Sequence, residues 1–137
     1  MKKTSIFNKL RSSGLRPTKQ RVEIAKFLFN RDKTFHFTVE SLSKYLTKKT
    51  TTKFALATIY NTVHAFKKAG HLSEVNLRGK NNTTYFDTNI SNHHHFYDSE
   101  TSELIDINDN EIKFDKIPKA PSGKTIKNLE VIINLKN

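Results

Sequence analysis

Three consecutive histidines, His93, His94 and His95, are the residues of this sequence best suited to chemistry. On a β-strand, successive side chains point to opposite faces, so His93 and His95 would share one face and His94 would lie on the other. Two imidazoles on one face can bind a metal ion together if one or two further ligands complete the site. A short polar histidine run at the edge of a linker is the alternative interpretation.

Two more residues are suited to complete such a site. His36 comes just before the third expected helix, and Asp87 closes an expected hairpin. Both therefore lie near ends of elements, where they can converge on the face that His93 and His95 share. Histidines with a carboxylate suit zinc, iron(II) or manganese. The triplet is also a candidate haem site, in which His94 would be an axial ligand to the iron. An exposed His94 without a ligand is the plainer alternative.

Other reactive chemistry is missing from the sequence. There is no cysteine, which excludes disulfides, structural zinc bound by cysteine, and thiolate catalysis. There is also no glycine-rich phosphate loop, nucleophile elbow or HExxH motif. We therefore expect no enzyme. A metal-dependent nuclease, using basic charge and the histidines, is the enzymatic alternative, and a non-specific architectural DNA-binding protein is a third possibility.

The charge of the chain is divided between its halves. Residues 1–80 carry 18 Lys and Arg against 4 Asp and Glu, whereas residues 81–137 carry 6 Lys against 9 Asp and Glu. A basic half followed by an acidic half is typical of a DNA-binding part joined to a part with another role, and a solvated lysine-rich surface is the alternative. The sequence has no apolar run that would serve as a signal peptide or membrane span, so we expect a cytoplasmic protein with no membrane contact.

Hydrophobic spacing predicts four helices in the basic half. The first ends near Gly14, and the second begins at Thr18. Thr38 is suited to cap a third, short helix. The fourth runs from about Ala55 to Ala69, with Gly70 as its stop.

The fourth expected helix has an apolar side for a core and a polar side for an outside partner. Asparagine, threonine, tyrosine and histidine side chains can all contact DNA bases or phosphates. We expect this polar side to enter the major groove, with Thr58, Tyr60, Asn61 and His64 as the contacting residues. A Tyr60 packed in the core and a merely solvated Asn61 are the alternative. Basic residues at the start of the second helix are phosphate or minor-groove candidates, namely Arg16, Lys19 and Arg21.

The pattern then changes from helical to alternating. Expected strands near 72–77 and 83–86 flank a basic turn at 78–82, and a helical pair followed by such a hairpin is the layout of a winged helix. The polar stretch 88–92 is the expected boundary between domains. The sequence beyond it predicts short strands at 93–97, 103–107 and 129–135, with a loop at 108–127.

We therefore expect an α+β protein with two domains. Residues 1–88 would form a winged helix-turn-helix that binds DNA, and residues 89–137 would form a small α/β, mostly β, domain for dimerisation and ligand sensing. The second part is too small to be a credible independent monomer, which favours pairing with a second copy.

Three segments, taken in order, resemble the ferric uptake regulator (Fur) family: GLRPTKQRVEIAKFL, HFTVESLSKYL and ALATIYNTVHAFKKAGHL. The resemblance covers roughly residues 14–107. Within that family, YNTVHAF, YFDTN, the His triplet with FYD, and SELIDI are most similar to the iron response regulators (Irr). Most other members resemble a version with Arg after the recognition-helix Tyr and with two Cys-x-x-Cys pairs. In this chain Asn61 follows Tyr60, and the thiols are absent.

The resemblance implies a homodimer that represses iron- or haem-related genes by binding an inverted repeat in DNA. It also implies a regulatory metal site made of His36, Asp87, His93 and His95, with Asp87 where Glu is usual. Any haem sensing would rest on the His triplet, since the Cys-Pro haem motif of some relatives is absent. A sensor of iron, manganese or zinc without a haem response is the alternative. The short, Pro-interrupted C-terminal part also predicts that the helix found there in many relatives is missing.

Overall fold

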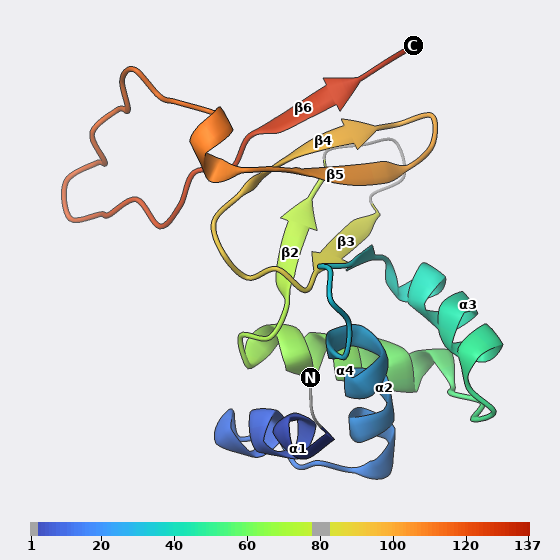
Figure 1. The fold of residues 1–137 in the computed structure, drawn as a ribbon. Helices are drawn as coiled ribbons and strands as arrows, with labels where there is room; N and C mark the ends of the chain where they lie inside the picture. Colours follow the sequence, from blue (N-terminus) through green and yellow to red (C-terminus); the bar gives the residue numbers. More distant parts are fainter. Residues whose placement is uncertain (1–2, 78–82) are drawn as a thin grey trace. The chain divides into compact units, whose positions relative to one another are not determined.

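The computed structural model describes residues 3–77 and 83–137 (Figure 1), which fall into two compact units, Met1–Ile90 and Ser91–Asn137. The first unit contains α1 (Lys3–Ser12), α2 (Lys19–Phe29), β1 (His36–Phe37), α3 (Val39–Lys49), α4 (Leu56–Lys68), β2 (Ser73–Asn76) and β3 (Thr84–Asp87). The second contains β4 (His94–Asp98), β5 (Glu103–Ile107), the 3-10 turn η1 (Asp109–Glu111) and β6 (Ile132–Leu135). The predicted α+β class is confirmed: a helical winged-helix unit is followed by a β-rich unit. Among the described residues, no helix combines the length and apolar character needed to cross a bilayer.

The ends of the helices follow from local chemistry. Thr18 Oγ1 accepts a backbone N–H from the first turn of α2. Thr38 and Ser41 form a capping box at the start of α3, in which each side chain accepts the other residue's backbone N–H. Gly14 and Gly70 follow α1 and α4 with φ values of 85° and 89°, a left-handed conformation that glycine adopts without strain. The predicted stops of both helices are therefore confirmed.

The apolar faces of the four helices meet in one core. Its side chains with at most 1% exposure on the helices are Ile6, Leu10, Ile24, Ala25, Leu28, Leu42, Leu46, Ile59, Val63 and Phe66. This packing leaves the opposite side of α4 facing outward. Tyr45 of α3 lies at the edge of this core, where it is 42% exposed and stacks on Phe27.

The three-stranded sheet of the first unit has the order β1-β3-β2. β2 and β3 pair antiparallel as the predicted hairpin, while the predicted basic turn at 78–82 lies outside the described residues. β1 was not predicted. It pairs antiparallel with β3 so that His36 is opposite Asp87 and Phe37 is opposite Phe86. A strand of two residues is too short to show an alternating hydrophobic pattern, so it can be recognised only from its pairing with β3.

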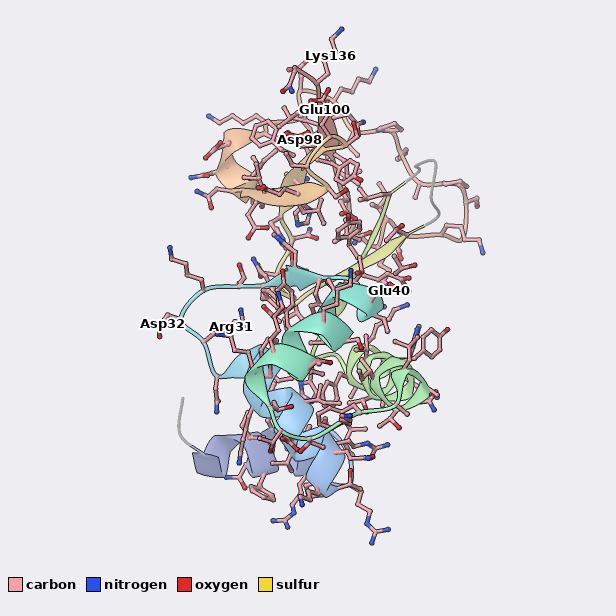
Figure 2. All side chains as sticks on the ribbon, turned by 90° about the vertical axis from the view of Figure 1, so that its right-hand side faces the viewer. Arg31, Asp32, Glu40, Asp98, Glu100 and Lys136 are labelled. Carbon is pink, nitrogen blue, oxygen red and sulfur yellow. The ribbon has the colours of Figure 1, made fainter. Side chains whose placement is uncertain are left out.

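The second unit is a sheet with the order β5-β4-β6, in which β4 pairs antiparallel with β5 and parallel with β6. Figure 2 shows Asp98, Glu100 and Lys136 at one end of this unit. The connection from η1 to β6, residues 112–131, contains no helix and runs as a long loop (Figure 1). Proline lacks the N–H that a helix needs, and the loop contains Pro118 and Pro121. The predicted absence of a helix is therefore confirmed.

The capping box of α3 gives a test of local stability. We expect Thr38→Ala to lower the free energy of unfolding by about 1 kcal/mol, because a backbone N–H at the start of α3 loses its acceptor. Thr47→Ala, on the exposed surface of the same helix, is the matched control and should leave stability unchanged or slightly higher. Chemical denaturation of both variants measures the difference. Equal unfolding free energies would contradict the assigned cap.

A second stability prediction concerns His71, whose Nε2 lies 2.7 Å from Ser13 Oγ. Burial, and then the charge of Lys9, lower the pKa of His71 below its usual value of 6.5. The unfolded chain therefore binds this proton more readily, so the free energy of unfolding falls as the pH drops below about 6.5 toward the folded-state pKa. We expect His71→Gln to show a shallower loss of stability over this range in thermal melts. A variant with the wild-type pH dependence would show that His71 does not titrate this way.

Candidate functional site

The polar side of α4 is exposed, as the sequence predicted. Tyr60 is 52% exposed, Asn61 is exposed, and Thr58 is partly exposed. Ile59, Val63 and Phe66 on the other side are at most 1% exposed. The alternative in which Tyr60 packs in the core is therefore excluded. The helix presents side chains that can form hydrogen bonds on a rigid, well-anchored frame.

A hollow of about 400 Å³ joins this side of α4 to the start of α2. It is lined by Arg16, Thr18, Gln20, Arg21, Thr58, Asn61 and Thr62. The structure thus brings two of the predicted phosphate contacts, Arg16 and Arg21, beside two of the predicted base contacts, Thr58 and Asn61. Arg21 also donates to the carbonyl oxygen of Arg16 at 3.2 Å, which ties the guanidinium to the α1–α2 connection. Lys19 is exposed and does not line this hollow.

Tyr60 and His64 line a second hollow, of about 450 Å³, on the side of α4 nearer the hairpin. Their ring centroids are 4.2 Å apart. His64 is only partly exposed, since its ring also meets Phe86 of β3 at 5.7 Å. It is therefore less available to an outside partner than Tyr60.

Two of the predicted metal ligands face each other in the first unit. The β1–β3 register makes His36 and Asp87 partners, and His36 Nε2 lies 3.1 Å from Asp87 Oδ2. The other carboxylate oxygen of Asp87 accepts the N–H of Asn89 at 2.8 Å. Thr88 Oγ1 in turn accepts the N–H of Phe35 at 2.9 Å, which holds the strand ends together. A carboxylate fixed in this way keeps its other oxygen, Oδ2, directed at the imidazole of His36.

The other two predicted ligands meet in the second unit. His93 Nε2 and His95 Nε2 lie 3.3 Å and 3.2 Å from the same oxygen, Asp106 Oδ1. His93 Nδ1 is 2.7 Å from the Ser91 carbonyl oxygen; as the donor of that hydrogen bond, it leaves a lone pair on Nε2. Glu130 Oε1 lies 3.7 Å from His95 Nδ1, on the far side of that ring. Two imidazole nitrogens and a carboxylate oxygen therefore converge within 4.8 Å of one another, a donor set that suits Zn²⁺, Fe²⁺ or Mn²⁺.

His94 lies in a different environment, as strand alternation predicted. Its Nδ1 accepts the N–H of Val131 at 2.9 Å, so the ring proton of the neutral imidazole is on Nε2. Nε2 lies 3.4 Å from Asp109 Oδ1, and the side chain is 2% exposed beside the ring of Phe114. A protonated nitrogen has no lone pair for iron. The geometry therefore gives no support to His94 as a haem ligand.

Comparison with known proteins identifies the family. The sequence profile of the Ferric uptake regulator family matches residues 12–133. The chain belongs to the ferric uptake regulator family. It is also 31% identical over 98 residues to the peroxide-responsive repressor PerR of Staphylococcus epidermidis (strain ATCC 12228 / FDA PCI 1200). That match covers 72% of this chain and 62% of the repressor, so the chain spans less than two thirds of that relative's length.

Solved structures of ferric uptake regulators share the fold. The regulator from Vibrio cholerae superposes with a TM-score of 0.72 at 22% identity, covering 96% of this chain and 98% of that one. The regulator from Pseudomonas aeruginosa, determined with manganese, superposes with a TM-score of 0.70 at 23% identity, covering 100% of this chain and 98% of that one. At these identities, the likeness supports the Fur-like fold of this chain and not its ligand.

In this ferric uptake regulator family member, the sequence did not predict one potential metal ligand, Asp106. Nothing in its spacing from the histidines indicated a contact, because it lies on a different strand. The β4–β5 register places Asp106 directly opposite His95. Strand alternation within SELIDI would have put Asp106 on one face of β5, but only the register shows that the histidines share that face.

The convergence on Asp106 gives a prediction about metal affinity. We expect Asp106→Asn to weaken the binding of Co²⁺, a spectroscopic probe for a site of this type, by at least about tenfold, because a neutral amide is a poorer ligand than a carboxylate. Asp115→Asn, at an exposed position in the 112–131 loop, is the control. Titration of both variants, followed by visible absorption, gives the two affinities. Unchanged affinity in Asp106→Asn would exclude the carboxylate from the site.

Proposed function

We propose that this protein is a DNA-binding transcriptional regulator whose activity depends on a divalent metal, acting as a homodimer on an inverted repeat. The observation that carries the proposal is the exposed polar side of α4, flanked by a hollow with two arginines and followed by a hairpin. In winged-helix proteins such a helix enters the major groove, while basic residues contact phosphates. The basic charge of residues 1–80 supports the same partner.

Within this proposal, the residues of the first unit divide into two roles. Thr58, Tyr60 and Asn61 contact base edges, where an asparagine amide can pair with adenine and a threonine methyl can meet thymine. Arg16, Lys19 and Arg21 contact the phosphate backbone. Residues 89–137 are the dimerisation and sensing part. Dimerisation brings together the two DNA-binding units that a two-fold symmetric operator requires. Family membership supports repression as the outcome of binding.

For the signal, we propose a divalent metal held by His36 and Asp87 of the first unit together with His93, His95 and Asp106 of the second. Both groups of donors fit a cation, since each brings imidazole nitrogen within 3.3 Å of a carboxylate oxygen. A bound ion supplies the positive charge that lets these donors lie together. Ligands contributed by both units restrict the angle between the DNA-binding units of a dimer, and only some angles fit two half-sites.

Family membership supports iron as the regulated metal, with manganese and zinc as the other candidates. Haem is a separate prediction that rests on the sequence resemblance to iron response regulators alone. Titration of the metal-free protein with haem tests it: a Soret shift that is lost when the triplet is substituted would support haem. No shift would leave the divalent metal as the signal.

The test of the proposed function starts with duplexes enriched from a random pool by the wild-type protein. We expect an inverted repeat, bound at least about a thousandfold more tightly than random duplex at physiological salt. Affinity for this duplex should differ at least about tenfold between protein with Mn²⁺ and protein with chelator, because a ligand shifts an equilibrium only through different affinities for its two states. Mobility-shift titrations measure both ratios.

Two variants separate the metal response from folding. The double variant His93→Ala/His95→Ala should bind the duplex equally with Mn²⁺ and with chelator. His71→Gln, which changes a histidine outside the donor set, should keep the wild-type difference. Equal binding of selected and random duplexes would indicate an architectural protein instead. Metal-dependent cleavage of the DNA would indicate a nuclease, and either result would overturn the proposal.

A further inference from the structure

The exposed tyrosine of α4 contacts a histidine one turn further along the helix. Tyr60 is 52% exposed, and its ring centroid lies 4.2 Å from that of His64, with the planes tilted by 43°. Residues four apart on a helix are neighbours on its surface, so this contact is built into the spacing. An exposed tyrosine would otherwise sample several rotamers, and the imidazole limits that choice.

His64 is in turn held by the sheet. Its ring meets Phe86 edge to face, at 5.7 Å with the planes at 84°, a favourable geometry for aromatic pairs. Phe86 is 1% exposed and stacks on Phe37, its partner in the β1–β3 pairing, at 5.7 Å. The imidazole therefore lies between an exposed ring and a ring that the core fixes.

A hollow beside this contact could accommodate the ring of Tyr60 if the imidazole were absent. The hollow of about 450 Å³ is lined by Tyr60, His64 and Phe86, and also by Glu40 and Glu74. Glu40 lies in the first turn of α3 (Figure 2), and Glu74 on β2 accepts a hydrogen bond from Lys67 of α4. Without the imidazole, the phenol ring would have open space to enter and carboxylates to accept a hydrogen bond from its hydroxyl. Its outward orientation would then no longer be favoured.

We propose that His64 is a positioning residue for DNA recognition: it holds Tyr60 in the outward orientation and does not itself contact DNA. The inference rests on the proposed function and revises the sequence-based expectation that His64 enters the groove. Holding a side chain in its bound orientation before association lowers the entropy lost on binding, which increases affinity without adding a contact. The effect should appear in specific binding, because contact with phosphates does not require the ring of Tyr60.

The test uses the full chain with Mn²⁺ and two probes, the duplex enriched by the wild-type protein and a random duplex of equal length. We expect His64→Ala to weaken binding of the enriched duplex about five- to tenfold, as expected for the loss of one aromatic pair. His64→Phe should restore affinity to within about twofold of the wild type, since it keeps the ring contact. Neither variant should change binding of the random duplex by more than the measurement error. His64→Ala should lower the thermal midpoint by a few degrees, because the contact with Phe86 is also lost, whereas His64→Phe should stay near the wild-type midpoint.

A double-mutant cycle distinguishes positioning from direct contact. In a Tyr60→Ala background, His64→Ala should cause no further loss, because a residue that acts through Tyr60 has nothing left to position. A further loss in that background, or a His64→Phe variant as weak as His64→Ala, would show that the imidazole contacts DNA itself. Equal weakening on both duplexes would assign His64 a purely structural role. Any of these three results overturns this inference, whereas failure of the wild-type protein to enrich any duplex overturns the proposed function itself.

Discussion

The pairing of β1 with β3, a ladder of two residue pairs, positions the polar and aromatic side chains that the proposed sites of the first unit depend on. One pair, His36 with Asp87, joins side chains 51 positions apart in the sequence and brings an imidazole to a carboxylate. The adjacent pair, Phe37 with Phe86, stacks two buried rings. Because neighbouring side chains of a strand point to opposite faces, the polar pair and the aromatic pair are separated by the sheet itself. A change that breaks this ladder disturbs the proposed metal donors and the support of α4 together.

The aromatic face of this ladder continues in both directions. Toward α4, Phe86 meets His64, which meets Tyr60. Away from α4, Phe37 stacks on Phe35, and the Arg31 guanidinium lies 3.9 Å from the centroid of the Phe35 ring. Aromatic side chains have few rotatable bonds, so each ring in this series of contacts restricts the orientation of the next one. Tyr60, the proposed recognition side chain, is in this way connected to the core of its unit.

The three consecutive histidines have two different environments, because alternate side chains point to opposite faces of the sheet. His93 and His95 turn nitrogen atoms toward the carboxylate of Asp106, an arrangement that attracts a cation. His94, between them in sequence, accepts a backbone N–H from Val131 beside β6 and thereby helps to join β6 to the sheet. The identical side chains differ only in the face they occupy. A buried imidazole with a backbone donor is a structural group, whereas two imidazoles beside a carboxylate offer a donor set that suits a metal ion.

The sequence by itself determined the local parts of this protein. Helical periodicity, Thr38 as a cap and Gly14 and Gly70 as stops are properties of neighbouring residues, so the four helices and the exposed side of α4 followed from them. The alternation of the histidines followed in the same way, and the absence of cysteine excluded a thiolate zinc site. Only the tertiary structure decided what depends on strand pairing: the two-residue β1, the contact of His36 with Asp87, and the place of Asp106 opposite His95. The tertiary structure also decided that His64 lies against Phe86. The helical pattern of α4 alone had predicted an outward-facing His64. The physical reason is that backbone hydrogen bonds between distant strands fix the register, and the register, not the spacing along the chain, determines which side chains share a face.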